Sequence, residues 1–219
     1  MLLMKNLDIA HIRQDYSKKE LSVDDCLPDP MDQFNIWLEE AIAAKVNEPT
    51  AMNIATVSAE GKPSARMVLL KGVENQQFVF YSNYQSRKGE QITANSYVAL
   101  TFFWPELERQ VRIQGSVSKI SNEDSDAYFY SRPPGSRIGA WASNQSTLIK
   151  SRQELEENEL KYQKQFGEEI PRPPHWGGYI VKPHRFEFWQ GRPNRLHDRI
   201  VYIIENTQHI EWHKCRVAP

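Results

Sequence analysis

Short β-forming runs, separated by turn residues, follow one another from residue 51 onward, and this pattern restricts the fold more than any other feature of the chain. The runs 51–58 and 65–71 flank the turn residues 60–63, which predicts a β-hairpin. Further strands are expected at 78–82, 97–103 and 108–120, with an interruption at Gly115, and two or three more between Tyr179 and the C-terminus. Because helices are inserted between these strands, we predict a single α+β domain built on an antiparallel β-barrel or sandwich.

Helices are expected at several places between the strands. In the clearest one, Asp29 is the N-cap, Pro30 takes the first helical position, and apolar residues follow with helical spacing. The residues of this apolar face are Phe34, Trp37, Leu38, Ala41 and Ile42. Other helices are expected at 5–16, at 86–95 with Ser86 as the cap, at 122–131, and at 150–166 with an apolar stripe of Leu148, Leu155, Tyr162 and Phe166. Residues 132–136, which include two prolines, predict a break before a short segment at 138–142.

The charge of the chain is nearly balanced, since 27 Lys and Arg against 28 Asp and Glu give a formal net charge of −1. Bulk charge therefore does not favour binding to nucleic acid or to a membrane, and an anion site must come from local clustering. The apolar runs are too short for a signal peptide or a membrane span. Cys26 and Cys215 form no C-x-x-C pair, so free thiols are favoured, although a disulfide stays open. We expect a soluble, cytoplasmic protein.

Several widespread catalytic motifs are absent from the sequence. There is no Walker A run, no G-x-G-x-x-G after a strand, no H-E-x-x-H and no G-x-S-x-G. The six histidines are scattered without the spacing of metal ligands, so no metal site is expected. P-loop and Rossmann nucleotide sites are therefore unsupported.

Basic residues gather at two positions near the expected hairpin and the helix that follows it. Arg87 and Lys88 come directly after Ser86 at a helix start, where the dipole disfavours cations but free N–H groups attract an anion such as phosphate. Taken alone, this pair is better explained by solvent exposure. Arg66 and Lys71 flank an apolar run, and regular alternation places them on opposite faces, either to serve different groups or as ordinary strand-end charges.

A third group combines two hydroxyls with a guanidinium. Tyr128 and Arg132 are four residues apart at a helix end, and Ser136 follows the prolines. The set suits a phosphate, because Arg can bind two phosphate oxygens at once. Capping of the helix C-terminus by Arg132 explains it equally well.

The densest group lies in residues 186–199, a strand–turn–strand unit with three aromatics, three arginines and a histidine. Alternation from Arg195 places His197 and Arg199 on one face. Cationic and titratable groups in register beside aromatic rings favour an anionic, aromatic ligand over a purely structural role. Nucleic acid is a weaker alternative, because the balanced charge and the lack of a comparable second basic segment count against it.

Six short motifs follow one another along the chain. They are Arg66-Met-Val-Leu-Leu-Lys71, Tyr81-Ser-Asn-Tyr-Gln-Ser-Arg-Lys88, Leu107-Glu-Arg-Gln-Val111, Ser131-Arg-Pro, Trp189-Gln-Gly with Arg195-Leu-His-Asp-Arg199, and the ending Arg216-Val-Ala-Pro219. Together they resemble the pyridoxine (pyridoxamine) 5′-phosphate oxidase family, and the likeness extends from His11 to the last residue. No single motif is decisive, but their shared order makes coincidence improbable.

The resemblance implies a split β-barrel FMN-binding fold, an antiparallel barrel with peripheral helices, in a homodimer with two FMN sites between the subunits. Residues 29–219 would form this single domain, and residues 1–28 a partly mobile segment that closes over the active site. The residues that match the family's FMN contacts are Arg66, Met67, Val68, Leu69, Leu70, Lys71, Tyr81, Ser82, Arg87, Lys88, Gln110, Gln145, Ser146, Trp189 and Arg199. Those that match its substrate contacts are Arg13, Tyr16, Lys71, Tyr128, Arg132, Ser136, Leu196 and the active-site pair Arg195 and His197.

The implied reaction is the FMN-dependent oxidation of pyridoxamine or pyridoxine 5′-phosphate to pyridoxal 5′-phosphate, the last step in making this vitamin B6 cofactor. Oxygen would accept the electrons and give hydrogen peroxide, and the amine substrate would also release ammonia. Two other hypotheses stay open: a related split-barrel flavin oxidoreductase with a different substrate, and a module that binds pyridoxal phosphate or nucleic acid without turnover. The substrate-side residues favour the oxidase.

Overall fold

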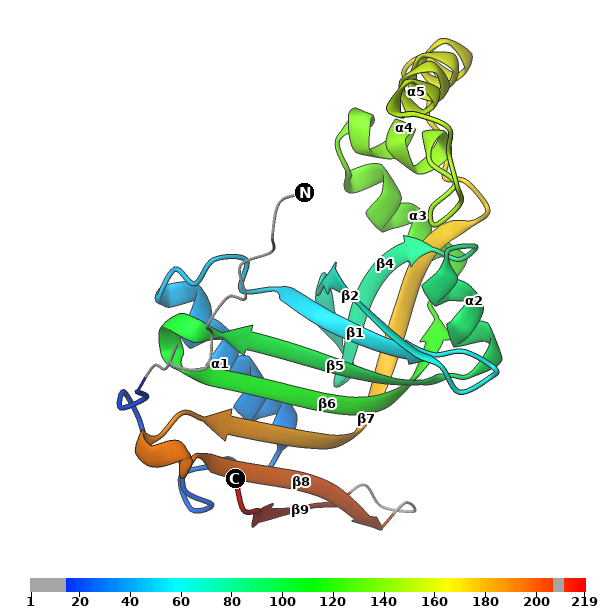
Figure 1. Cartoon of the computed structure of the whole chain (residues 1–219). Helices are drawn as coiled ribbons and strands as arrows, with labels where there is room; N and C mark the ends of the chain where they lie inside the picture. Colours follow the sequence, from blue (N-terminus) through cyan, green and yellow to red (C-terminus); the bar gives the residue numbers. More distant parts are fainter. Residues whose placement is uncertain (1–14, 207–210) are drawn as a thin grey trace, which may run out of the picture.

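The strands form one strongly curved antiparallel sheet (Figure 1). The computed structural model describes residues 15–206 and 211–219, and nine strands of this part belong to the sheet. They are β1 (Ala51–Val57), β2 (Pro63–Leu69), β3 (Gly72–Glu74), β4 (Gln77–Asn83), β5 (Tyr97–Trp104), β6 (Arg109–Lys119), β7 (Trp176–Gln190), β8 (Asp198–Asn206) and β9 (Glu211–Arg216). The order is β2-β1-β5-β6-β7-β4-β3, and β8 pairs with β7 and β9. The predicted α+β class and the β1–β2 hairpin are confirmed.

The long strand β7 divides the sheet into two arms. One edge of β7 pairs with β6, while the other pairs first with β4, over 176–181, and then with β8, over 185–190. At the division the register of β6 shifts between Gln114 and Gly115, which confirms the interruption expected there. A Cβ at Gly115 would lie only 2.6 Å from the Lys182 carbonyl oxygen, so the close approach at this bulge requires glycine.

The helices agree with the sequence prediction except at one place. They are α1 (Pro30–Ala43), α2 (Arg87–Ala94), α3 (Asn122–Ser131), α4 (Pro134–Ala142) and α5 (Arg152–Phe166), with short 3-10 turns at Pro105–Leu107 and Pro193–Arg195. The helix α4 replaces the short segment expected at 138–142. Pro133 is its N-cap and Pro134 its first residue, where a missing N–H costs nothing, so the prolines that end α3 also begin α4. The helix expected at 5–16 lies almost wholly outside the described residues.

The main core fills the space between α1 and the concave face of the sheet. Phe34 is fully buried, with its ring centroid 4.9 Å from that of Phe78 and 5.0 Å from that of Phe102. Trp37 and Ala41 are also buried, as their spacing predicts. Ile42 is 54% exposed, so its assignment to the buried face was wrong.

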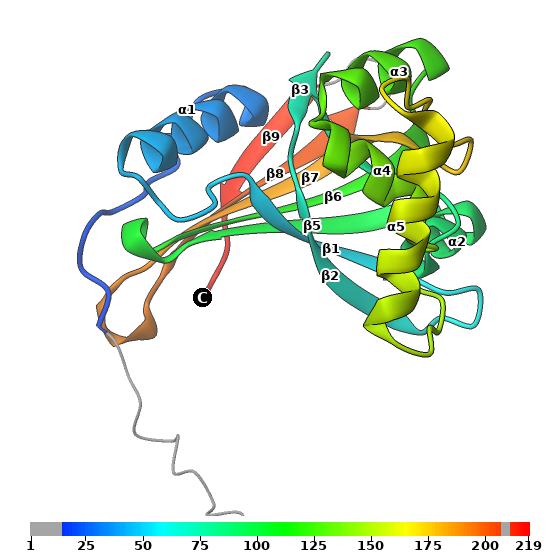
Figure 2. The ribbon, with the colours of Figure 1, turned by 90° about the horizontal axis from the view of Figure 1, so that it is seen from above.

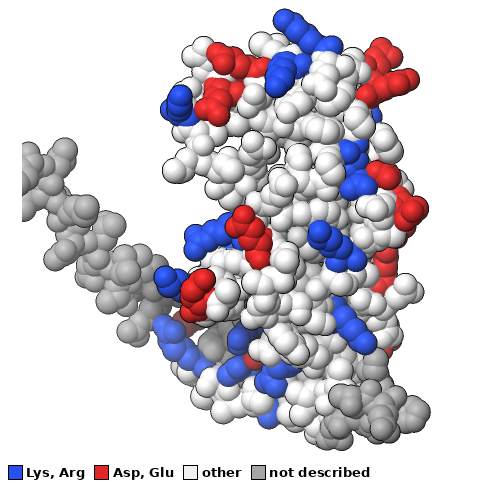
Figure 3. Space-filling view, turned by 90° about the vertical axis from the view of Figure 1, so that its right-hand side faces the viewer, with Lys and Arg blue, Asp and Glu red and all other residues white. Residues whose placement is uncertain are grey.

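A second, smaller core lies under α3, α4 and α5, apart from α1 in both ribbon views (Figure 2). Phe129 of α3, Ile138 of α4 and Trp176 of β7 are buried there. The helix α5 buries none of its residues completely, and Figure 3 shows acidic and basic side chains mixed over this end of the molecule. Leu148, expected on the apolar stripe of α5, precedes the helix and is fully exposed.

Among the described residues, no helix combines the length and the apolar character needed to cross a membrane.

The packing of α1 gives a direct stability prediction. Phe34→Ala should lower the free energy of unfolding by about 3–5 kcal/mol, because it removes a fully buried ring between three aromatic neighbours. Ile42→Ala, on the exposed face of the same helix, should change it by less than about 0.5 kcal/mol. Urea denaturation at one fixed protein concentration measures both, and equal losses would contradict this assignment of the two faces.

Candidate active site

A cavity of about 940 Å³ opens between the hairpin strand β2, the end of β4, the start of α2 and the pair α3–α4. It brings together residues from four separate segments of the sequence, 66–71, 81–88, 128–136 and 145–146. The predicted site residues that line it are Arg66, Met67, Val68, Leu69, Lys71, Tyr81, Ser82, Arg87, Lys88, Tyr128, Arg132, Ser136, Gln145 and Ser146. Lys71 lines the same cavity as Arg66, although β2 ends at Leu69 and regular alternation does not continue to Lys71. The expectation of opposite faces assumed a regular strand through Lys71, and this condition is not met.

The charge of this cavity is one-sided. Its described lining contains the cations Arg66, Lys71, Arg87, Lys88 and Arg132 and no Asp or Glu. Burial, and then the charge of Arg87, lowers the pKa of Arg66. Burial, and then the charge of Arg66, lowers the pKa of Lys88, so the cations also repel one another. A cavity of this kind is stabilised by a bound anion.

Lys88 is the most confined of these cations. Its side chain is buried, and its Nζ donates to Ser82 Oγ at 2.9 Å, Ser86 Oγ at 3.0 Å and Gln145 Oε1 at 2.6 Å. All three acceptors are neutral, so desolvation lowers the pKa of Lys88 to about 8. Ser86 is also the N-cap of α2, as predicted, which fixes the ammonium beside the start of this helix.

Arg66 is oriented by hydrogen bonds within the hairpin and to α2. Its Nη1 donates to Thr56 Oγ1 and its Nη2 to Ser64 Oγ, each at 2.6 Å. Both hydroxyls in turn donate to Gln91 Oε1 of α2, at 2.6 and 2.7 Å. The guanidinium is therefore fixed in position by groups that do not neutralise its charge.

The α3–α4 side of the cavity joins aromatic rings to Arg132. The rings of Tyr81 and Tyr128 are stacked with centroids 3.7 Å apart, and the Arg132 guanidinium lies 4.6 Å from the ring centroid of Trp176. Burial raises the pKa of Tyr81 to about 12 and also raises that of Tyr128, so both phenols keep their protons at neutral pH. The Nη1 atom of Arg132 is buried and has no hydrogen-bond partner. A buried guanidinium nitrogen without a partner, in a cavity that the hydroxyl residues Tyr128 and Ser136 also line, fits a phosphate group.

A second group of predicted residues lies elsewhere, across β6, β7 and β8. Gln110 is paired with Trp189, and Trp189 with Arg199, so these three side chains share one face of the sheet. The Arg199 Nε donates to Glu187 Oε1 at 3.0 Å, and its Nη1 donates to the Ala218 carbonyl at 2.7 Å. Glu187 and the C-terminal tail thereby fix Arg199.

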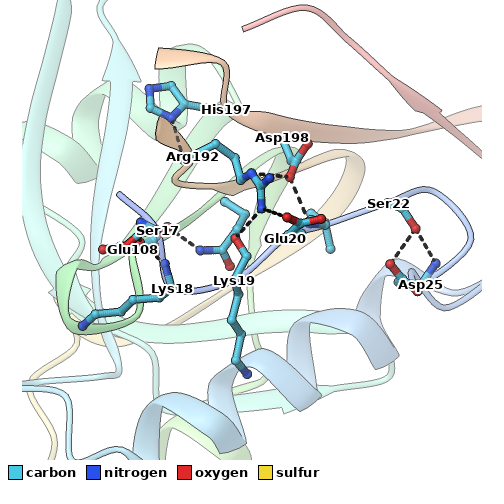
Figure 4. A network of polar contacts seen from close by, with 12 residues as sticks. Ser17, Lys18, Lys19, Glu20, Ser22, Asp25, Glu108, Arg192, His197 and Asp198 are labelled. Atoms are coloured by element: carbon cyan, nitrogen blue, oxygen red, sulfur yellow. Dashed lines mark hydrogen bonds and ion pairs between the residues drawn. The ribbon is translucent and has the colours of Figure 1, made fainter. Parts of the chain in front are cut away.

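The loop before β8 carries His197 against Trp189, with ring centroids 4.7 Å apart (Figure 4 shows His197 and its loop). The Nδ1 of His197 accepts a hydrogen bond from the Arg192 backbone N–H at 3.1 Å, which leaves the proton of the neutral ring on Nε2. Burial, and then the charge of Arg195, lowers the pKa of His197, so the neutral ring is the form present at neutral pH. Tyr16 covers the same ring edge-on, at 5.8 Å.

Arg195 does not lie in a strand. It belongs to the 3-10 turn Pro193–Arg195 and has a left-handed φ of 61°, while β8 begins only at Asp198. The alternation drawn from Arg195 to Arg199 was therefore wrong, although His197 and Arg199 both lie next to Trp189. Arg195 and Leu196 are exposed in the single chain.

The single chain leaves the predicted site residues in two separate groups. None of Gln110, Trp189, Arg195, His197 or Arg199 lines the cavity, and Leu70 packs its side chain into the core. Arg13 lies outside the described residues. Within the described part of the chain, no cluster of His, Cys, Asp or Glu could hold a metal ion.

Sequence reasoning missed several residues that shape these groups. Trp176 and a face of α4 with Gly139, Ala140 and Ser143 line the cavity. For the residues of α4, the signal was the proline pair 133–134, which marks a helix start as well as a helix break. Glu187, the partner of Arg199, sits between the buried Phe186 and Phe188, and an acid in such a run is itself a sign of a charge partner.

Comparison with known proteins gives consistent matches along the chain. The family model described as pyridoxamine 5′-phosphate oxidase matches residues 38–165, and the model described as pyridoxine 5′-phosphate oxidase C-terminal dimerisation region matches residues 176–219. A protein from Chromobacterium violaceum named pyridoxine/pyridoxamine 5′-phosphate oxidase is 58% identical over 98% of this chain and 100% of its own length. A protein of the same name from Actinobacillus pleuropneumoniae serotype 5b is 59% identical over 97% and 100%.

Two solved structures share the fold. PhzG from Burkholderia lata 383, in complex with tetrahydrophenazine-1-carboxylic acid, has a TM-score of 0.85 and 26% identity and covers 93% of this chain and 100% of its own. A pyridoxamine 5′-phosphate oxidase-related, FMN-binding protein from Nostoc punctiforme PCC 73102 has a TM-score of 0.69 and 20% identity over 87% and 98%, a likeness of fold. The expected split-barrel fold is thus confirmed.

The pKa of Lys88 leads to a prediction about anion binding. Lys88 attracts a phosphate ester only when protonated, so affinity should be full below its pKa of about 8 and fall above it. Between pH 7 and pH 9 we expect FMN, the ligand implied by the resemblance, to bind about tenfold more weakly, the ratio of the two protonated fractions. Calorimetric titration of the flavin-free protein measures this.

The control is Lys88→Met, which is similar in length and has no charge. This variant should bind FMN more weakly than the wild type at pH 7. Its FMN affinity should not show the tenfold decrease between pH 7 and pH 9. The same decrease in affinity in this variant would mean that a group other than Lys88 titrates.

Proposed function

The chain belongs to the pyridoxamine 5′-phosphate oxidase family, and on this basis we propose that it is an FMN-dependent oxidase that makes pyridoxal 5′-phosphate. Pyridoxine 5′-phosphate and O₂ give pyridoxal 5′-phosphate and H₂O₂. Pyridoxamine 5′-phosphate, water and O₂ give the same aldehyde with H₂O₂ and ammonia. In both cases two electrons and two protons pass from the substrate to oxygen.

The observation that carries this proposal is the cavity with five cations and no carboxylate in its described lining. Its 940 Å³ lie at the upper end of the range for small-molecule sites. Arg66 lies close enough to Arg87 and Lys88 to affect their charges mutually, whereas Arg132 lies against Trp176 beside α3, which supports a separate place for each of two phosphate groups. Aromatic rings in the same cavity suit a planar ligand.

The residues present fit FMN on their own chemistry. A buried lysine with only neutral partners and an oriented arginine provide for a phosphate ester, with Ser82, Gln145 and Ser146 close by. When bound, FMN would supply the two-electron acceptor that side chains lack. The protein's contribution is to bind, orient and keep out water.

On the substrate side, Tyr128, Arg132 and Ser136 would bind the phosphate, since they offer two hydroxyls and an unpaired guanidinium. His197 would donate a hydrogen bond from its Nε2, the atom left protonated by the Arg192 contact. The exposed Arg195 beside it would hold the substrate ring. The segment up to residue 28 would close over this place, and Tyr16, packed on His197, represents it in the described chain.

These groups form one site only if a second copy of the chain contributes. The cavity of one subunit would meet the Gln110–Trp189–Arg199 row and the Arg195–His197 loop of another. The match of residues 176–219 to a dimerisation region supports a homodimer, and the row lies on β7 and β8 of this region and on the adjacent β6. Exposed apolar side chains on β2, Met67 and Leu69, beside the cavity, suit such a contact.

The other candidate is a split-barrel flavin oxidoreductase with a different substrate. It is favoured by the structural likeness to PhzG, which was solved with tetrahydrophenazine-1-carboxylic acid. The phosphate-sized group of Tyr128, Arg132 and Ser136 argues against it, because a carboxylic acid without a phosphate does not require a second cationic pocket.

An absorbance spectrum followed by an oxidase assay tests the proposal. The purified protein should have flavin absorbance, consume oxygen with pyridoxine or pyridoxamine 5′-phosphate, and form the aldehyde. A yellow protein that is inert with both phosphorylated substrates would favour a flavin oxidoreductase with a different substrate. Protein that binds pyridoxal 5′-phosphate but no flavin would support a binding module instead.

The composite site leads to a complementation prediction. Arg132→Ala and His197→Ala subunits should each be nearly inactive alone. Co-expressed in equal amounts, they should regain about a quarter of wild-type activity, because half of the dimers are mixed and one of their two sites is intact. No recovery would mean that Arg132 and His197 act within the same site-forming subunit.

A further inference from the structure

Residues 15–21 run along the end of the sheet and are attached there by polar contacts from distant parts of the chain (Figure 4). Glu108 accepts two of them: its Oε2 receives the backbone N–H of Ser17 at 2.9 Å and of Lys18 at 3.0 Å. Lys18 adds a hydrogen bond from Nζ to the Glu106 carbonyl at 2.6 Å. A carboxylate that accepts two consecutive backbone N–H groups fixes the path of that backbone.

Glu108 itself is unusually placed for a glutamate. The residue is only 3% exposed, and its backbone is left-handed, with φ 54° and ψ 40°. Its carbonyl accepts hydrogen bonds from the Gly191 N–H at 2.8 Å and from Gln190 Nε2 at 3.2 Å. The residue thus connects the N-terminal segment directly to the end of β7, next to Trp189. Among the described residues, both hydrogen bonds to its carboxylate come from this segment.

The residue that this contact positions is Tyr16, which directly precedes Ser17. Its ring packs edge-on against Trp189 at 5.6 Å and against His197 at 5.8 Å. Its Cβ and Cγ also occupy the space where a side chain on Gly191 would begin, since a Cβ there would lie 2.7 Å from both atoms. Tyr16 therefore fills a place shaped by Glu108 on one side and by the bare Gly191 on the other.

We propose that Glu108 is a positioning residue for the oxidation: its carboxylate fixes Ser17 and Lys18 so that Tyr16 stays over the Trp189–His197 wall of the substrate site. The inference rests on the proposed function, which places the substrate beside His197. Glu108 touches neither substrate nor cofactor and acts through the N-terminal segment. Its loss should weaken capture of the substrate more than the chemical step.

Loss of this contact should leave the rest of the segment and the fold in place. The neighbouring residues have their own attachments: the Leu21 N–H donates to Asp198 Oδ2 at 3.0 Å, and Glu20 forms an ion pair with Arg192 at 2.6 Å. Substitution of Glu108 therefore releases residues 16–18 in particular.

The experiment compares Glu108→Ala, Glu108→Gln and Glu106→Gln in the full-length protein as purified with its flavin. Glu106 is the matched control, because it lies in the same turn, is exposed, and its side chain accepts only a long 3.4 Å contact from the Asn47 N–H among the described residues. Hydrogen exchange of residues 15–21 measures whether the contact of Glu108 with Ser17 and Lys18 is kept. KM, kcat and flavin content measure how its loss affects substrate binding, turnover and cofactor binding.

In Glu108→Ala we expect the Ser17 and Lys18 amides to exchange about tenfold faster or more, the effect of losing a charged acceptor. KM should rise by a similar factor, with kcat and flavin content within about twofold of the wild type. Glu108→Gln keeps an acceptor oxygen, so its amide exchange rates and its KM should lie between those of the wild type and those of Glu108→Ala. Glu106→Gln should match the wild type.

Gly191→Ala tests the same role with the carboxylate intact. Its methyl group would displace Tyr16, so KM should rise again without loss of flavin. Unchanged exchange in Glu108→Ala, or faster exchange with unchanged KM, would overturn the inference, as would loss of flavin equal to the loss of activity. A wild-type protein inert with both phosphorylated substrates would overturn the proposed function, whatever the exchange data show.

Discussion

The cavity between β2, β4, α2 and α3–α4 carries positive charge that no Asp or Glu of its described lining neutralises. Burying an ammonium such as that of Lys88 among neutral acceptors is costly, and Arg66 and Arg132 are held nearby without a carboxylate among the described cavity residues. A fold keeps such an arrangement where an anion completes it. The proposed phosphates of a flavin and of a vitamin B6 substrate would do so, and the cofactor would then add to the stability of the site.

The division of the sheet at β7 explains why one chain holds only half of the proposed site. The first half of β7 pairs with β4 and leads to the cationic cavity, whereas the second half pairs with β8 and leads to Trp189, Arg199 and His197. The two halves of β7 therefore place the cationic cavity and the group of Trp189, Arg199 and His197 at separate positions in one chain. A homodimer can join them, and the N-terminal segment attached at Glu108 then lies at the second group, where the substrate is expected.

The fold was largely predictable because its signals are local. The N-cap Asp29 with Pro30, the Ser86 cap, the hairpin turn and the interruption at Gly115 all stand in the sequence, and each has its expected structural effect. The missed helix α4 shows the limit of such signals, since Pro133 and Pro134 end one helix and start the next. Exposure of Ile42 shows another, because helical spacing does not say how wide the buried face is.

The residue types suited to phosphate and aromatic ligands, the order of their motifs and the family could all be read from the sequence, because they depend on local chemistry and order along the chain. Three features became visible only in the folded chain: Lys71 and Arg66 line one cavity, Arg195 lies in a left-handed turn outside β8, and Glu108 binds the backbone of Ser17 and Lys18. These facts depend on where strands end and which distant backbones meet. Such contacts join residues far apart in the chain, as Ser17 and Glu108 are, and no local pattern encodes them.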